Sequence, residues 1–142
     1  MTDNAFDLDR FVSAQAGIFD TALSELEAGH KRSHWMWFIF PQLSGLGRSA
    51  RAQYYGMSGL AEASAYLDHP VLGERLRACT RIVIDTQALS LRHIFDTPDD
   101  LKFCSSMTLF SRAARDATLF DEALERWCAG PNKATLRLLE SA

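Results

Sequence analysis

The fold of this chain is decided by the stretch Ser33-His34-Trp35-Met36-Trp37-Phe38-Ile39-Phe40-Pro41-Gln42-Leu43. Aromatic rings at this density bury a large apolar area. The apolar pattern neither alternates nor follows one helical face, so we expect protein to cover both sides of the stretch. Ser33 is a suitable N-cap and Pro41 disfavours helix at Phe40, which predicts a short buried helix over 35–39. A buried strand is the alternative, but no other segment offers a partner strand.

Length and composition bound the remaining possibilities. With 142 residues, 47% hydrophobic and 23% charged, the chain is typical of one soluble globular domain over 1–142. The net charge of -3 and the lack of a long basic run predict no strong electrostatic binding to nucleic acid. No apolar run reaches the roughly 18 residues of a membrane helix, and the N-terminus lacks a signal-peptide pattern. We therefore expect a cytoplasmic protein without a membrane partner.

Helical spacing of apolar residues extends through most of the chain. The apolar spacing over residues 7–28 predicts one helix. We expect Asp7 to cap this helix and Gly29 to end it in the left-handed conformation. The predicted helices span residues 7–28, 35–39, 49–55, 58–67, 71–89, 98–115, 118–128 and a last segment after the cap Asn132. Ser49 can cap the helix that it opens, and Thr97-Pro98-Asp99-Asp100 is a helix-start signal. The sequence thus predicts an all-α fold, a single compact multi-helix domain of about six to eight helices with the Trp-rich helix at its centre.

The cysteines lie far apart in the sequence. Cys79, Cys104 and Cys128 are an odd number without the close spacing of a zinc site or a disulfide framework. We expect three structural free thiols buried in helices, and no intramolecular disulfide.

Several motifs together resemble an uncharacterised bacterial family, domain of unknown function 1810, which is often mislabelled calpastatin. These motifs are Asp7-Leu8-x-Arg10-Phe11-Val12-x-Ala14-Gln15, Gly29-x-Lys31-x-Ser33 continuing through Leu43, His69-Pro70-Val71-Leu72-Gly73, and Lys102-x-x-Ser105-Ser106-Met107-Thr108-Leu109-Phe110. The resemblance implies a compact all-helical domain and supplies no established activity. Relatives fused to macro domains, which bind ADP-ribose, imply a link to nicotinamide-dinucleotide or ADP-ribose metabolism by association only. Family members tend to have an acid where this chain has Asn132, and a helix cap tolerates either.

Histidines are the first candidates for chemistry. His30 and His34 have the spacing of metal ligands on a helix, but Gly29 and Ser33 indicate that the helix begins after His30. No further ligand lies close in sequence, so we predict neither a metal site nor a cofactor. His34 could pair with a serine as an acid–base group, or it could be a core histidine bonded to a backbone carbonyl. No G-x-S-x-G turn is present, which argues against a serine hydrolase.

The polar residues around the aromatic stretch suggest a pocket. A tryptophan could stack on a base or pack between helices, and cations such as Arg10 could hold a phosphate or lie on the surface. Aromatic walls with a few convergent polar groups are typical of small-molecule sites. The predicted ligand-binding residues are Lys31, His34, Trp35, Trp37, Gln42, Lys102, Ser105 and Ser106.

Three functions are compatible with this prediction. The first is a domain that binds a small molecule, a nucleotide or an ADP-ribose-like compound by family association. The alternatives are a protein-interaction module, in which the polar residues are structural, and an enzyme that uses His34 as acid–base.

Overall fold

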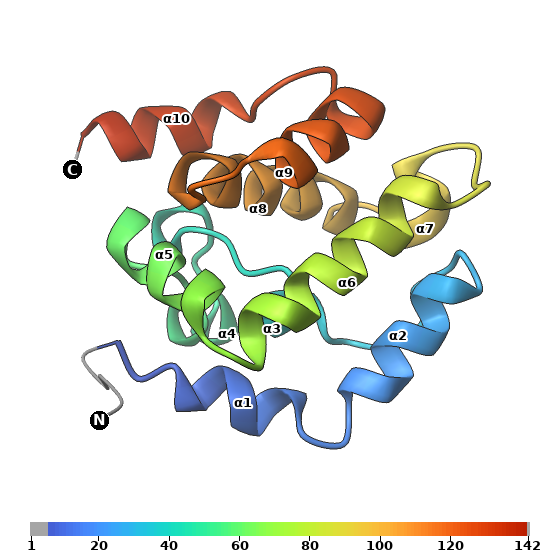
Figure 1. Cartoon of the computed structure of the whole chain (residues 1–142), viewed down its shortest axis with the longest axis horizontal. Coiled ribbons are helices and arrows are strands. Elements are labelled where there is room, and N and C mark those ends of the chain that lie inside the picture. Colours follow the sequence, from blue (N-terminus) through green and yellow to red (C-terminus); the bar gives the residue numbers. More distant parts are fainter. Residues whose placement is uncertain (1–5, 142) are drawn as a thin grey trace.

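Ten α-helices follow one another through residues 6–141, the part of the chain that the computed structural model describes (Figure 1). They are α1 (Asp9–Gln15), α2 (Phe19–Glu27), α3 (Met36–Ile39), α4 (Ala50–Tyr54), α5 (Leu60–Asp68), α6 (Leu72–Asp85), α7 (Leu91–Phe95), α8 (Asp99–Ala113), α9 (Thr118–Ala123) and α10 (Lys133–Glu140), with a 3-10 turn η1 (Ser44–Leu46) and a π-helical turn η2 (Leu124–Cys128). Within these residues no strand forms, and Leu43 and Met57 make an isolated β-bridge. The all-α prediction is therefore confirmed. Seven helices have six or more residues, and the other three, α3, α4 and α7, have four or five.

The aromatic stretch lies in the core, as its pattern predicts. Trp35, Met36, Ile39 and Phe40 are almost fully buried. Phe40 packs edge-on against Phe95 and also against Phe103 of α8. The helical part of the stretch is short, and α3 contacts α1 and α6.

The N-terminal run forms two helices where one was predicted. Gly17 adopts a φ of +77° between α1 and α2, a left-handed conformation that ends α1 and redirects the chain. The predicted cap is also wrong, because α1 starts after Leu8 and Asp7 itself has a positive φ. Gly29 does have the expected left-handed conformation, with a φ of +80°.

Two other predicted N-caps are confirmed, whereas that of Ser33, like that of Asp7, is wrong. Ser49 Oγ accepts a hydrogen bond from the Ala52 amide at 3.1 Å, and Asn132 Oδ1 accepts one from Thr135 at 2.9 Å. Ser33 does not cap α3, because its hydroxyl donates instead to Glu25.

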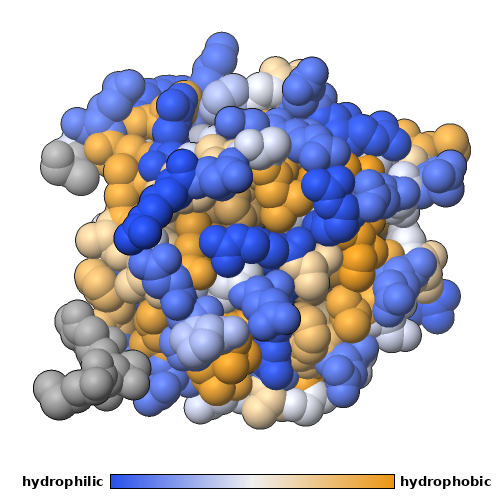
Figure 2. All heavy atoms as spheres, viewed as in Figure 1, coloured by the Kyte–Doolittle hydropathy of each residue, from blue (hydrophilic) through white to orange (hydrophobic). Residues whose placement is uncertain are grey.

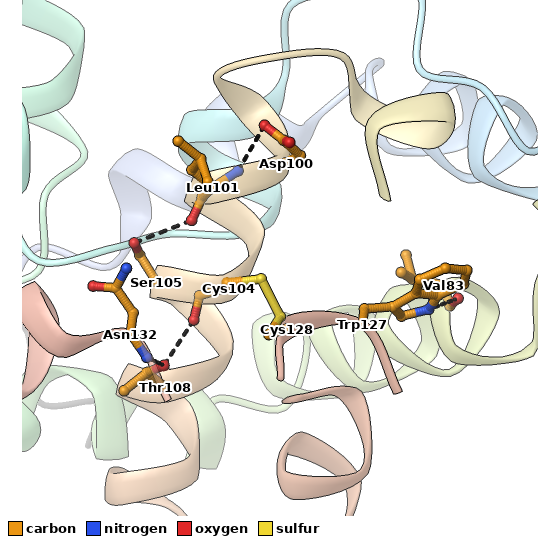
Figure 3. The surroundings of a disulfide bond; sticks show 9 residues. All are labelled: Val83, Asp100, Leu101, Cys104, Ser105, Thr108, Trp127, Cys128 and Asn132. Carbon is orange, nitrogen blue, oxygen red and sulfur yellow. Dashed lines mark hydrogen bonds between the residues drawn. A yellow bond between two sulfur atoms is a disulfide. The ribbon is translucent and has the colours of Figure 1, made fainter. Parts of the chain in front are cut away.

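The expectation of three free thiols is wrong for two of them. Cys104 on α8 and Cys128 at the end of η2 form a disulfide, with their Cα atoms 5.8 Å apart (Figure 3). The 24-residue separation hides this pairing, because the chain reverses after α8 and brings η2 back against it. Cys79 is free and buried, as predicted.

Hydrophilic residues are spread over the face seen in Figure 2, with hydrophobic ones between them. Among the helices of residues 6–141, none combines the length and the apolar character that a bilayer crossing needs.

Candidate functional site

Two of the predicted cations meet on one carboxylate. Lys31 Nζ lies 2.9 Å from Asp99 Oδ2, and Lys102 Nζ lies 3.3 Å from Asp99 Oδ1. Asp99 is the first residue of α8, where a negative charge is favourable. Asp99 therefore brings together a lysine from the loop after α2 and a lysine from α8. In the sequence, Asp99 has only the signal of a helix start, and no pattern predicts this second role.

Each of these lysines also lies over a tryptophan ring. Lys31 Nζ is 5.3 Å from the ring centroid of Trp35, and Lys102 Nζ is 5.0 Å from that of Trp37. The guanidinium of Arg51, on α4, is 5.2 Å from the same Trp37 ring. These distances are within the range of cation–π attraction. Trp37 thus has a positive charge from two different helices against its ring.

The two tryptophans differ in their exposure to solvent. Trp35 is completely buried, and its Nε1 donates to Glu25 Oε1 at 2.9 Å, which makes it part of the core. Trp37 is half-buried, so part of its ring surface is open to a partner from solution. Of the two predicted stacking residues, only Trp37 is accessible from solution.

A small hollow lies beside Trp37. Gln42 and Lys102 line it together with Trp37, and its other walls are Met36, Phe40, Ala52, Tyr55 and Gly56. Its volume is about 10 Å³, which is room for about one water molecule. The structure therefore brings three of the predicted residues, Trp37, Gln42 and Lys102, together around a hollow that does not enclose a larger ligand. A nucleotide-sized molecule would have to lie over the solvent-exposed part of Trp37.

The remaining predicted residues lie away from this hollow. His34 is exposed, and its side chain makes no hydrogen bond or ion pair with any residue in 6–141. Ser105 is buried, and its hydroxyl donates back to the Leu101 carbonyl at 3.2 Å. Ser106 is fully buried, and its Oγ has no hydrogen-bond partner among the described residues. Neither serine lines the hollow.

Glu25 organises the loop that precedes the tryptophans. Its carboxylate accepts hydrogen bonds from the amides of Arg32 and Ser33 at 2.7 and 2.9 Å, from Ser33 Oγ at 2.6 Å and from Trp35 Nε1. Burial alone would raise the pKa of Glu25, but these four hydrogen bonds favour the carboxylate and lower its pKa to about 2. Glu25 therefore fixes the start of the aromatic stretch. The helical pattern places Glu25 among the surface acids of its helix, so the sequence does not predict this role.

Arg10, a candidate phosphate ligand, has internal partners for its guanidinium. Its Nη2 lies 2.8 Å from Glu62 Oε2 and also donates to the Gly56 carbonyl, while Nε and Nη1 donate to the backbone carbonyls of Tyr54, Phe6 and Asp7. Glu62 in turn accepts from the amide and hydroxyl of Ser58. Both members of this pair are buried and satisfied, so Arg10 has a structural role.

A larger groove lies between the ends of α2 and α6 and the segment that carries α7. Its volume is about 1140 Å³, and its lining includes His30 and Asp96, whose Nε2 and Oδ2 atoms are 3.6 Å apart. From the sequence, His30 is a candidate only for metal binding, and no sequence pattern predicts this groove. In the described part of the chain, no three His, Cys, Asp or Glu side chains gather in a way that could hold a metal ion.

Comparison with known proteins gives a family and one solved relative. The model of a family described as protein of unknown function (DUF1810) matches residues 5–139. The crystal structure of the conserved hypothetical protein Rv1873 from Mycobacterium tuberculosis is 51% identical. The match covers 95% of this chain and 97% of that one, with a TM-score of 0.93. The search of curated proteins gave no match.

Proposed function

This chain belongs to the DUF1810 family of proteins of unknown function, and we propose that it is a cytoplasmic binding domain for a small planar anion. The proposed ligand is a nucleotide or an ADP-ribose-like molecule, whose base stacks on Trp37 and whose phosphates are held by Arg51 and Lys102. The family association with ADP-ribose guides the choice of ligand, and the arrangement at Trp37 guides the choice of site.

One observation carries this proposal: the ring of Trp37 is half-buried and has two cations within cation–π distance of it. Stacking of a base on an aromatic side chain contributes about 1–3 kcal/mol. Arg51 is exposed, so it can leave the ring and follow a phosphate without breaking an internal ion pair in the described residues. Lys102 is held by Asp99, so its charge stays beside the ring. A ligand with both a planar group and a negative charge could stack on the Trp37 ring and pair with the two cations.

Gln42 and Lys31 support this site in different ways. Gln42 lines the hollow beside Trp37, where its amide could bond the edge of a base and displace the water that the hollow can hold. Lys31 is buried beside Asp99 and Trp35, so it positions Asp99 rather than contacting a ligand. We leave His34, Ser105 and Ser106 out of the proposed site, since none of them lines the hollow.

The two alternatives have weaker support. An acid–base role for His34 needs a reactive partner within hydrogen-bond distance, and its exposed side chain has none among residues 6–141. An interaction module should expose a contiguous apolar patch. The exposed large hydrophobic residues of the described chain come from separate elements: Tyr54, Leu60, Val71, Leu89, Leu101 and Leu138.

A thermal-shift titration with matched variants tests the proposal. The probes are ADP-ribose, ADP, AMP, ribose 5-phosphate and inorganic phosphate. A ligand at a hundred times its Kd stabilises the folded state by about 2.7 kcal/mol, which moves the Tm measurably. We expect a nucleotide probe to raise the wild-type Tm, and Arg51→Ala and Trp37→Leu to remove that rise.

The chain offers a close control for these variants. Trp127 is also half-buried, and the Arg126 guanidinium lies 4.0 Å from its ring centroid. Arg126→Ala and Trp127→Leu should keep the full ligand response, because they change a similar pair at a different place. If no probe shifts the wild-type Tm, or if Arg126→Ala weakens the response as much as Arg51→Ala, the proposed function is wrong.

A further inference from the structure

The segment Leu124–Gly130 has a backbone that needs external support. Its first five residues form the π-helical turn η2, a rare conformation that often marks functional positions. Ala129 follows with φ 54° and ψ 32°, a left-handed conformation that non-glycine residues seldom adopt, and Gly130 has a φ of 114°. Seven consecutive residues are thus held away from ordinary α-helix.

The disulfide joins this segment to α8 directly before the left-handed residue Ala129. Cys128 is the last residue of η2, directly before Ala129, and it is bonded to Cys104 on α8. Trp127, its neighbour in sequence, extends in the opposite direction, and its Nε1 donates to the Val83 carbonyl on α6 at 2.9 Å (Figure 3). These two adjacent residues thus engage two different helices, α8 and α6.

We propose that the Cys104–Cys128 pair is a reversible thiol–disulfide site, and that its reduction loosens the segment Leu124–Gly130, which stays attached to α6 through Trp127, while the rest of the domain stays folded. Both cysteines are half-buried, so a small thiol reagent can approach them, whereas Cys79 is sealed in the core. Disulfides of reducing compartments are mostly transient or redox-sensing. The cytoplasmic setting expected from the sequence therefore favours a reversible site over a permanent crosslink.

The reaction is ordinary thiol–disulfide exchange with a dithiol reductant. A thiolate of the reductant attacks one sulfur, breaks the Cys104–Cys128 bond and forms a mixed disulfide, and the displaced protein thiolate takes up a proton. The second thiol of the reductant then attacks the mixed disulfide and releases the other protein sulfur as a thiol. The protein gains two electrons and two protons, and the reductant leaves as its own disulfide. Oxidised glutathione drives the reverse reaction.

Contacts on both sides of the segment limit the change. Phe120, before the segment, is buried and packs against Phe110 of α8. After the segment, the Asn132 amide donates to Thr108 Oγ1 at 2.8 Å, and that hydroxyl donates to the Cys104 carbonyl (Figure 3). Neither contact uses the disulfide, so α9 and α10 stay attached to α8 when it opens.

Hydrogen exchange with thiol counting tests this inference on the whole protein. Dithiothreitol under native conditions should raise the number of free thiols per chain from one to three, without loss of the helical circular dichroism signal. Amides in 124–130 should then exchange at least about tenfold faster, while those of α5 and the middle of α8 stay unchanged. Oxidised glutathione should restore slow exchange.

Variants separate a reversible site from a structural crosslink. The double variant Cys104→Ser/Cys128→Ser should show the fast exchange permanently, and Cys79→Ala should respond to both reagents as the wild type does. The inference is overturned if the disulfide resists dithiothreitol until the protein unfolds, or if reduction unfolds the whole domain. It is also overturned if exchange in 124–130 is the same in both states, or if oxidised glutathione forms no Cys104–Cys128 bond.

Discussion

Replacing Glu25 by Gln should destabilise the protein in a way that depends on pH. The carboxylate of Glu25 accepts bonds from two backbone amides, Ser33 Oγ and the Trp35 indole. The fall of its pKa from 4.5 to about 2 corresponds to at most about 3.4 kcal/mol of stabilisation at neutral pH. Because Glu25 is partly exposed and solvent screens its interactions, we expect Glu25→Gln to cost about 2 kcal/mol.

The direction of the pH effect follows from the lowered pKa. A carboxylate whose pKa is lower in the folded than in the unfolded chain contributes its full stabilisation above about pH 4.5. That stabilisation is lost as the pH falls from 4.5 towards about 2. The stability difference between wild type and Glu25→Gln should therefore be largest near neutral pH and should shrink over this acidic range.

Urea denaturation at a series of pH values, followed by circular dichroism, measures this difference. The control is Glu27→Gln, which removes an exposed carboxylate from the same helix and should change stability by less than about 0.5 kcal/mol. A cost for Glu25→Gln below about 0.5 kcal/mol at pH 7, or a cost that stays constant down to pH 2.5, would refute the role given to Glu25.

Other positions give three further predictions. A Cβ at Gly73 would lie 2.0 Å from a backbone oxygen, so Gly73→Ala should lower the free energy of unfolding, measured with urea, by about 2 kcal/mol or more. The control Gly59→Ala, with open space around its Cβ, should lower it by less than about 0.5 kcal/mol. Burial raises the pKa of the Cys79 thiol to about 12, so iodoacetamide at pH 8 should label it only in unfolded protein, and labelling of the native state would contradict its burial. Arg10→Met should cost about 3–5 kcal/mol because it leaves the Glu62 carboxylate buried without its partner, and Arg10→Met/Glu62→Gln should recover part of that loss.

Local sequence rules predicted the fold class and several boundaries. Ser49 and Asn132 cap their helices as expected, because an N-cap depends on a few neighbouring residues. The break at Gly17 was missed because the apolar spacing continues on both sides of it, and a single glycine within a helical pattern is often tolerated. The Cys104–Cys128 bond was missed because it depends on how α8 and η2 pack.

For the candidate site too, the sequence predicted some residues and missed those that depend on tertiary packing. The sequence pointed to the aromatic stretch and to Lys102, and Trp37, Gln42 and Lys102 do lie together. It could not show that Trp35 would be sealed in the core while Trp37 stays half-exposed. It also missed Arg51, which belongs to a separate short helix and reaches Trp37 only through tertiary packing.

Stacking of a ligand on Trp37 can be observed through the indole N–H signals in a ¹H–¹⁵N nuclear magnetic resonance titration with ADP-ribose and ADP. Trp35 and Trp127 donate their indole protons to Glu25 and to the Val83 carbonyl, and they serve as internal references. We predict a saturable shift of the Trp37 indole signal with at most small changes in the other two. An unchanged Trp37 signal at millimolar concentrations of both ligands, or a larger shift at Trp127, would show that neither ligand stacks on Trp37.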